Sequence, residues 1–274
     1  MTGAVAAGLS VGWLALRERA DAAARSTDLV QLVTAAQGLR PWVLHDLGAG
    51  TGSMARWLAP RLPGTQHWVL HDRDHVLLEV GVGTPPKDAV GRPVVTTSAA
   101  GELDDLTAED LAGATVITAS AVLDMLTAAQ VERLCAVIAA TGAALLITLT
   151  VTGEVELGPG DPLDAPLRRA FNDHQRRAGL LGPDAAALAA RSLASRHYRV
   201  TTRHTPWHLG PADSDLTRAW LEGWVSAAVD ERPALRAAAA GYLRRRTPHL
   251  DSGGLSVTVG HRDLFAAPDR SVAS

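Results

Sequence analysis

Short apolar runs alternate with helix-like segments in the first half of the sequence, after two helix-like segments within residues 1–40. Strands that are apolar throughout are typical of parallel sheets buried on both faces. Their alternation with helices indicates βαβ units and a doubly wound sheet. Thr127 and Gln130 add a capping box at the start of a helix that is predicted to reach residue 140. The predicted strands are 42–47, 67–71, 93–97, 114–119 and 144–149.

This alternation ends after residue 151. Two later segments, 198–202 and 255–259, are β-like, and helices are predicted between them and before them. We therefore expect an α/β fold: a doubly wound, mostly parallel seven-stranded sheet with N-terminal helices and an inserted helical lid. The expected parts are a helical cap over 1–40, a doubly wound core over 41–151, the insertion over 152–195, and a C-terminal completion of the sheet over 196–274.

Composition narrows the function classes. Hydrophobic residues make up 47% and charged residues 20% of the 274, which is typical of a globular protein. A net charge of −3 gives no general attraction to nucleic acid. The strongest apolar run, 143–151, is far shorter than a membrane-spanning helix, so we expect a cytoplasmic protein that contacts neither nucleic acid nor membrane. The single cysteine, Cys135, excludes a disulfide framework and is predicted to be a core residue.

The most informative segment directly follows the first predicted strand. It contains glycines in the spacing Gly-x-Gly-x-Gly, within Asp46-Leu47-Gly48-Ala49-Gly50-Thr51-Gly52-Ser53. Glycine allows a tight turn and a close approach of the backbone to a ligand. A dinucleotide fingerprint would place a glycine where Ser53 stands, and a P-loop would require Gly-Lys-Ser/Thr. The loop therefore predicts a ligand site of another kind.

The glycine loop resembles motif I of the class I S-adenosylmethionine-dependent methyltransferases. The resemblance covers residues 42–151 well and extends loosely to 260. It implies a Rossmann-like core that binds S-adenosyl-L-methionine, in which Asp46 helps to place the amino group of the cofactor. Asp72, at the end of the second strand, would accept hydrogen bonds from both ribose hydroxyls, since a carboxylate can accept two at once.

Two further segments resemble the same family. Glu102 and Leu103 lie in a Gly-Glu-Leu-Asp-Asp-Leu segment similar to one that contacts adenine, although Glu102 stands where the family has Asp. Ser120 lies in the segment after the fourth strand that passes beneath the cofactor. Asp124, in the same segment, faces substrate or caps the next helix, and the sequence leaves both open. The implied cofactor-binding residues are Asp46, Gly48, Ala49, Gly50, Thr51, Gly52, Asp72, Arg73, Glu102, Leu103 and Ser120.

Several other polar residues are candidates for metal binding or catalysis. His71 and Asp72 project to opposite faces of a strand, which disfavours a metal site, and no metal is predicted. Asn172 and His174 lie in an unusually polar stretch of the predicted lid. His174 also continues an apolar stripe, so it is either a core histidine or a base that deprotonates the nucleophile. Asn172 could orient substrate, and the candidate catalytic residues are His174, Asn172 and Asp124.

Together these features predict an S-adenosylmethionine-dependent methyltransferase that acts on an oxygen or nitrogen of a small-molecule metabolite. The sulfonium is already activated, so such an enzyme mainly aligns the reactants, which supplies about 7–11 kcal/mol. The alternative is a catalytically idle S-adenosylmethionine-binding module that acts through protein–protein contacts. The sequence leaves the substrate and the oligomeric state open.

Overall fold

The computed structural model describes residues 10–37, 41–269 and 271. Parts of the expected N-terminal cap, at 1–9 and 38–40, lie outside the described residues. One sheet contains all strands of the described chain, in the order β3-β2-β1-β4-β5-β8-β6, with β7 paired to β8. Neighbours from β3 to β5 are parallel, and β8 is antiparallel to β5, β6 and β7. The strands are β1 (Trp42–Leu47), β2 (Gln66–Asp72), β3 (Val95–Ala100), β4 (Val116–Ser120), β5 (Ala144–Gly158), β6 (Tyr198–His204), β7 (Trp207–Leu209) and β8 (Ser256–Pro268).

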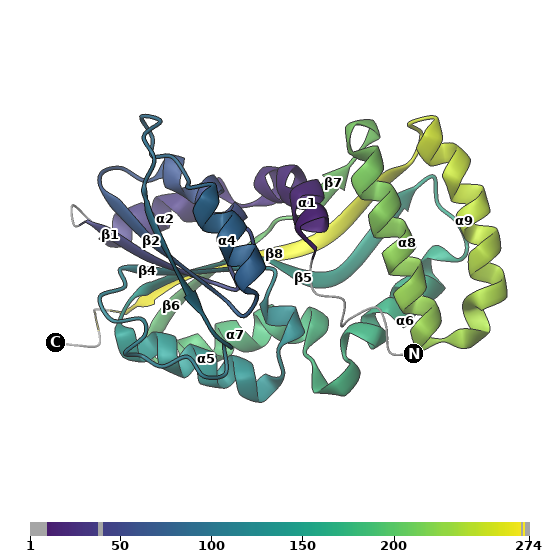
Figure 1. Cartoon of the computed structure of the whole chain (residues 1–274). Coiled ribbons are helices and arrows are strands. Elements are labelled where there is room, and N and C mark those ends of the chain that lie inside the picture. The colour runs from purple at the N-terminus through teal and green to yellow at the C-terminus, as the bar shows by residue number, and fades with distance from the viewer. Residues whose placement is uncertain (1–9, 38–40, 270, 272–274) are drawn as a thin grey trace.

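Helices cover both faces of the sheet, as Figure 1 shows. On one face α2, α3 and α4 pack on β1 and β2, and on the other α5 and α7 pack on β4, β5 and β8. The predicted capping box at Thr127 is confirmed at the start of α5. Cys135 is buried in the second of these layers, as expected. The helices are α1 (Val11–Ala24), α2 (Thr27–Gln37), α3 (Ser53–Leu58), α4 (His75–Gly83), α5 (Ala128–Thr141), α6 (Asp164–Gln175), α7 (Ala185–Ala194), α8 (Ser214–Glu231) and α9 (Arg236–Asp251).

The predicted fold class is confirmed, but several strands differ from their predicted bounds, and β5, β7 and β8 differ most. β5 continues to Gly158 instead of ending at 149, and β8 continues to Pro268 instead of 259. Long-range pairing accounts for the added length: residues 155–158 of β5 pair with residues 256–259 of β8, and residues 262–268 of β8 pair with β6. Local apolar patterning does not reveal these partners. The sheet also has an eighth strand, β7, which is too short to show a period.

The long β5–β8 ribbon carries a second hydrophobic core beyond the parallel sheet. Register shifts interrupt the ribbon between Ile147 and Thr150 and again between Val151 and Val155. Leu149 and Gly153 adopt positive φ there, so the strand changes direction. On this extension α1, α6, α8 and α9 pack around residues that include Trp224 and Tyr242 (Figure 1). Trp224 stacks on Trp220 with ring centroids 5.3 Å apart, which makes this pair core rather than a ligand cage.

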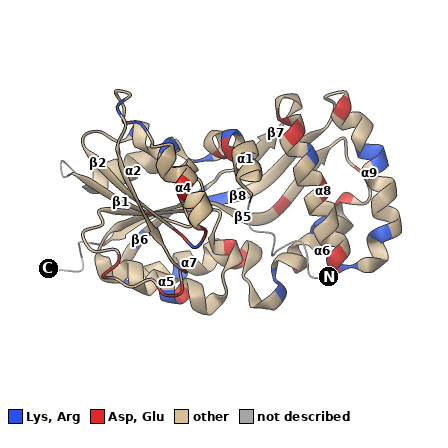
Figure 2. Ribbon diagram, viewed as in Figure 1, with Lys and Arg blue, Asp and Glu red and all other residues tan. Residues whose placement is uncertain are grey.

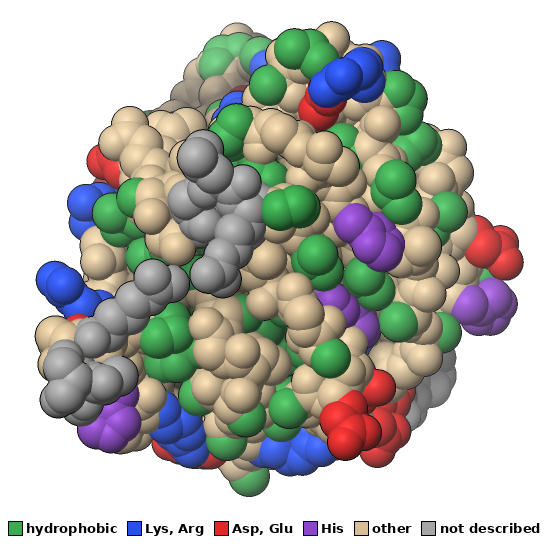
Figure 3. Space-filling view, turned by 90° about the vertical axis from the view of Figure 1, so that its left-hand side faces the viewer, with side chains coloured by type: hydrophobic (Ala, Val, Ile, Leu, Met, Phe, Trp, Pro, Cys, Tyr) green, Lys and Arg blue, Asp and Glu red, His purple; other side chains and the backbone are tan. Residues whose placement is uncertain are grey.

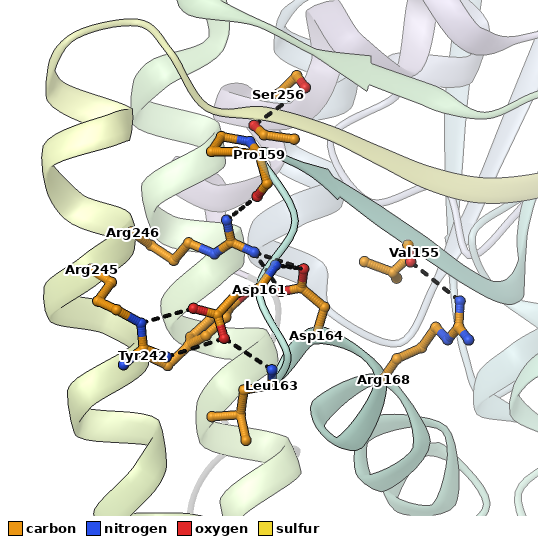
Figure 4. A network of polar contacts seen from close by, with 11 residues as sticks. Val155, Pro159, Asp161, Leu163, Asp164, Arg168, Tyr242, Arg245, Arg246 and Ser256 are labelled. Atoms are coloured by element: carbon orange, nitrogen blue, oxygen red, sulfur yellow. Dashed lines mark hydrogen bonds and ion pairs between the residues drawn. The ribbon is translucent and has the colours of Figure 1, made fainter.

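A buried ion-pair network joins α6 to α9 (Figure 4). Arg246, only 2% exposed, donates to both carboxylate oxygens of Asp164 and to the carbonyl of Pro159. Tyr242 donates its hydroxyl to Asp164 over 2.8 Å. The neighbouring Arg245 pairs with Asp161 at the surface. The network fixes the start of α6 against α9 and therefore holds the second core closed.

The described surface has neither a basic nor an apolar concentration in the views shown. Lys and Arg positions (blue) and Asp and Glu positions (red) are intermixed along the ribbon in Figure 2. Hydrophobic side chains are scattered over the face seen in Figure 3. Among the helices in the described part of the chain, none is both long and apolar enough to cross a membrane.

Candidate functional site

The carboxyl ends of β1, β2, β3 and β4 meet at one edge of the sheet, where open α/β sheets bind their ligands. The glycine loop after β1 turns through Gly48, Gly50 and Gly52, and all three have positive φ. A Cβ at Gly48 would lie 2.6 Å from Val122 Cγ2, so this position has no room for a side chain. At Gly50 the nearest side chain is Leu14 of α1, which places α1 over the loop.

Asp72 connects the glycine loop to the end of β2. Its Oδ2 accepts a hydrogen bond from the backbone N–H of Gly50 over 2.8 Å, and its Oδ1 accepts one from Asp74 over 3.0 Å. The backbone N–H of Gly101 donates to the carbonyl of Asp72. Asp72 therefore fixes the loop geometry, and each carboxylate oxygen retains a lone pair for a ligand hydroxyl.

The structure brings the candidate cofactor residues of the next loop to the same place. Arg73 and Glu102 approach within 4.0 Å, and both side chains are exposed. Leu103 follows Glu102 and is half-buried. Sequence positions 29 residues apart thus meet beside Asp72, as expected for loops after adjacent parallel strands.

Asp46 lies at the base of the site and is 1% exposed. Its Oδ1 accepts a 2.6 Å hydrogen bond from Thr118 Oγ1 on β4, whereas its buried Oδ2 has no partner. Desolvation raises the pKa of Asp46 to about 7, although the Thr118 hydrogen bond and the nearby Arg25 charge lower it. A buried acceptor without a partner is costly, so this oxygen fits a donor supplied by a ligand, such as an ammonium group.

Ser120 and Asp124 follow β4 on this edge. Ser120 Oγ lies 3.0 Å from both Arg25 Nη2 and Thr148 Oγ1. Asp124 does not cap α5, because Thr127 does. Its Oδ1 is buried without a partner, and desolvation raises the pKa of Asp124 to about 6. Of the two roles that the sequence left open for Asp124, contact with a ligand therefore agrees better with the structure than capping of the next helix.

The structure places Asn172 and His174 on α6, where both have contacts within the second core. Asn172 Nδ2 donates to the carbonyl of Gly153 over 3.0 Å and supports the kink in β5, while its Oδ1 has no partner. His174 is 7% exposed, and desolvation lowers its pKa. Its neighbouring charges are Arg177, Asp230 and Glu231, so it faces the end of α8.

His45 on β1 and His71 on β2 form a pair that the sequence pattern did not reveal. His71 Nε2 lies 2.9 Å from Nδ1 of His45, and their rings stack. Burial lowers the pKa of both groups, to about 4 for His45. Both imidazoles are therefore neutral, and the N–H of one ring can donate a hydrogen bond to the unprotonated nitrogen of the other. Across the described residues, no group of three or more His, Cys, Asp or Glu side chains is arranged to hold a metal ion.

Three site residues were missed from the sequence: Arg25, Thr118 and Asp263. Arg25 ends α1, far from the glycine loop in sequence, and inserts between Ser53 and Ser120. Asp263 is fully buried within β8. The only feature of the sequence that could have indicated such a residue is a charged side chain within an otherwise apolar stretch, as around Asp263.

No family model and no curated protein matches this sequence. Its structure is similar to that of a cyclopropane synthase from Mycobacterium tuberculosis, at 12% identity and a TM-score of 0.46, covering 88% of this chain and 83% of that one. Human N-acetylserotonin methyltransferase in complex with SAM is similar at 16% identity and a TM-score of 0.44, over 69% of this chain and 48% of that one.

Magnesium protoporphyrin IX methyltransferase from Synechocystis, with bound SAH, is similar at 14% identity and a TM-score of 0.44, over 70% of this chain and 78% of that one. One of these three similar structures is a cyclopropane synthase and two are methyltransferases.

Proposed function

We propose that this protein binds S-adenosyl-L-methionine at the carboxyl edge of the sheet and transfers its methyl group to an oxygen or nitrogen of a small-molecule metabolite. The observation that carries the proposal is the unpartnered, fully buried Oδ2 of Asp46 beside a glycine turn with three positive φ values. An acceptor held in that position fits the amino group of the cofactor, and the glycine turn leaves the backbone accessible to it.

The residues of the site have distinct tasks in this proposal. Asp46 binds the cofactor's amino group, and Asp72 orients the ribose while it holds the loop through Gly50. Arg73, Glu102 and Leu103 surround the adenine side. When bound, the cofactor supplies an activated methyl group on a sulfonium.

The protein then has to exclude water and align the acceptor. Leu14 of α1 lies over the loop at Gly50 and would exclude solvent. Alignment of bound reactants can supply about 7–11 kcal/mol. Asp124, with its pKa raised to about 6, is placed to accept a proton from an acceptor hydroxyl or amine. Asn172 would contact the acceptor from the α6 side through its unpartnered Oδ1, whereas His174 is assigned to the core.

The proposal is tested in two steps. Calorimetric titration with S-adenosylhomocysteine and with NAD should show binding of the first only, and the reverse result would refute the assigned cofactor class. Labelled S-adenosylmethionine is then incubated with a metabolite extract, and the product is identified by mass spectrometry. Cofactor binding without label transfer in any extract would instead favour the idle binding module.

A further inference from the structure

His261, on β8, is a buried histidine with a ring nitrogen that has no hydrogen-bond partner. Its side chain is 3% exposed, and Nδ1 meets no donor or acceptor within the described chain. Burial and the charge of Arg17 lower the pKa of His261 to about 3, although the carbonyl of Val259 acts in the opposite direction. The imidazole is therefore neutral near pH 7. Most buried polar atoms in proteins have a partner, so an unpartnered one indicates that something else binds there.

The imidazole is fixed in place by its neighbours on β7 and α1 (Figure 1). The Trp207 ring packs against it with the ring centroids 5.2 Å apart. Trp207 Nε1 in turn donates to Asp21 of α1 over 3.0 Å. The backbone N–H of Thr205 donates to the carbonyl of His261, also over 3.0 Å. None of these hydrogen bonds uses Nδ1, so the packing holds the ring and leaves this atom free.

His261 lies just beyond the carboxyl edge of the parallel strands. Ser120, the last residue of β4, is paired with Thr148 of β5. β5 then continues to Val151, which lies opposite His261 on β8. Three residues of a strand span at most about 10 Å. This distance leaves room for a small molecule between the end of β4 and the imidazole.

His261 also faces the same side of the sheet as the cofactor-side residues. Alternate residues of a strand share a face, so His261 and Phe265 point the same way, as do Ser120 and Val116. Phe265 and Val116 belong to the same hydrophobic core under α2 and α3. α1 covers this face in two places, because it lies over the glycine loop and its Asp21 contacts β7. The space between Ser120 and His261 is therefore beneath α1.

Asp124 provides a second unpartnered atom at this place. The charge of Arg17, on α1, acts on both Asp124 and His261. The Arg17 guanidinium lies over the Trp207 ring, 5.0 Å from its centroid, and its Nε is paired with Asp21. Asp124 Oδ1 is buried and, like His261 Nδ1, has no partner in the described chain. A ligand under α1 that satisfies both atoms has to carry two hydrogen-bonding groups.

We propose that the methyl acceptor binds beneath α1 between Asp124 and His261, and that Nδ1 of His261 accepts a hydrogen bond from a hydroxyl or amine of this acceptor. The inference rests on the proposed function. It narrows the substrate to compounds with at least two donor groups, one for each residue. A neutral imidazole offers a lone pair without competing with Asp124 for the proton, so His261 binds and orients the acceptor.

The test uses label transfer from labelled S-adenosylmethionine to serial dilutions of a metabolite extract. His261→Leu should raise the extract concentration that gives half-maximal transfer at least tenfold, about 1.4 kcal/mol. Its resistance to urea should be no lower than that of the unmodified protein, because the substitution removes a buried, unpartnered nitrogen. His261→Asn keeps a hydrogen-bonding atom near Nδ1 and should shift the half-maximal concentration less than threefold. The Kd of S-adenosylhomocysteine should change less than threefold in both variants.

His208→Leu is the matched control. His208 follows Trp207 on β7 and is exposed, so its side chain points away from α1. This variant should leave the half-maximal concentration unchanged.

Three results would overturn the assignment of His261 while leaving the proposed function intact. They are an unchanged half-maximal concentration in His261→Leu, an equal loss of stability and transfer in the Leu and Asn variants, and a tenfold loss of S-adenosylhomocysteine affinity. The second result would make His261 structural, and the third would place it at the cofactor. Absence of label transfer by the unmodified protein would refute the proposed function, and this inference with it.

Discussion

Replacement of Asp46 by Asn should stabilise the protein at alkaline pH and weaken ligand binding. Burial raises the pKa of Asp46 from 3.8 to about 7. At about 1.4 kcal/mol per unit, this shift of about three units corresponds to about 4 kcal/mol. Because the folded pKa is the higher one, the folded state binds the proton more tightly. The cost of burying the ionised group is therefore absent below pH 3.8 and complete above about pH 7.

The measurement is urea unfolding of both proteins between about pH 4 and 8. The difference in unfolding free energy, Asp46→Asn minus unmodified, should rise by about 4 kcal/mol across this range. The amide retains an acceptor for Thr118 but leaves a buried N–H₂ without a partner, which costs about 1–3 kcal/mol at every pH. This constant term does not affect the rise, and the net gain at pH 8 is about 1–3 kcal/mol.

Two comparisons complete this prediction. Asp105→Asn, at an exposed position, reports what the loss of a surface carboxylate does over the same pH range. The Kd of S-adenosylhomocysteine should rise at least tenfold in Asp46→Asn, since the amide has no charge for the ligand's ammonium. A stability difference that stays constant between pH 4 and 8 would refute the reasoning, because Asp46 would then titrate alike in both states.

Three other substitutions test the remaining assignments. Asp72→Ala removes the acceptor for Gly50 and for a ribose diol, so calorimetry should show at least a tenfold loss of S-adenosylhomocysteine affinity; unchanged affinity would exclude this role. His174→Ala should lower unfolding free energy by about 1–3 kcal/mol with normal turnover per folded molecule, whereas lost turnover at unchanged stability would place His174 in the reaction. Arg246→Met removes the cation that pairs with Asp164, which keeps only the Tyr242 hydroxyl and the Asp161 N–H as donors, and should cost about 3–5 kcal/mol in urea unfolding, against about 0–1 for Arg245→Met at the surface; equal costs would contradict the network in Figure 4.

The sequence by itself determined the parallel half of the fold and the chemistry at its edge. Local composition is enough to predict that an apolar run of five or six residues is a strand buried on both faces. For this reason β1, β2, β4 and the first half of β5 were predictable. Glycine at 48, 50 and 52 permits the positive φ that the structure shows at each position. Asp46 and Asp72 were also identifiable, because a strand end is defined by short-range pattern.

Tertiary structure decided what pairs across long sequence distances. The second half of β5 is rich in polar residues and pairs with the first half of β8, whereas the second half of β8 pairs with both β5 and β6. The hydrogen bond from the Asn172 amide nitrogen to the Gly153 carbonyl exists only because β5 kinks there, and no local pattern encodes it.

Arg25 is the clearest example. Its partners Ser53 and Ser120 lie 28 and 95 residues away. Whether such a charge is exposed or buried depends on how α1 docks over the glycine loop, and no local periodicity encodes that docking. Burial then makes the guanidinium important, because it is desolvated while the charges of Asp21, Asp46 and Asp263 act on it.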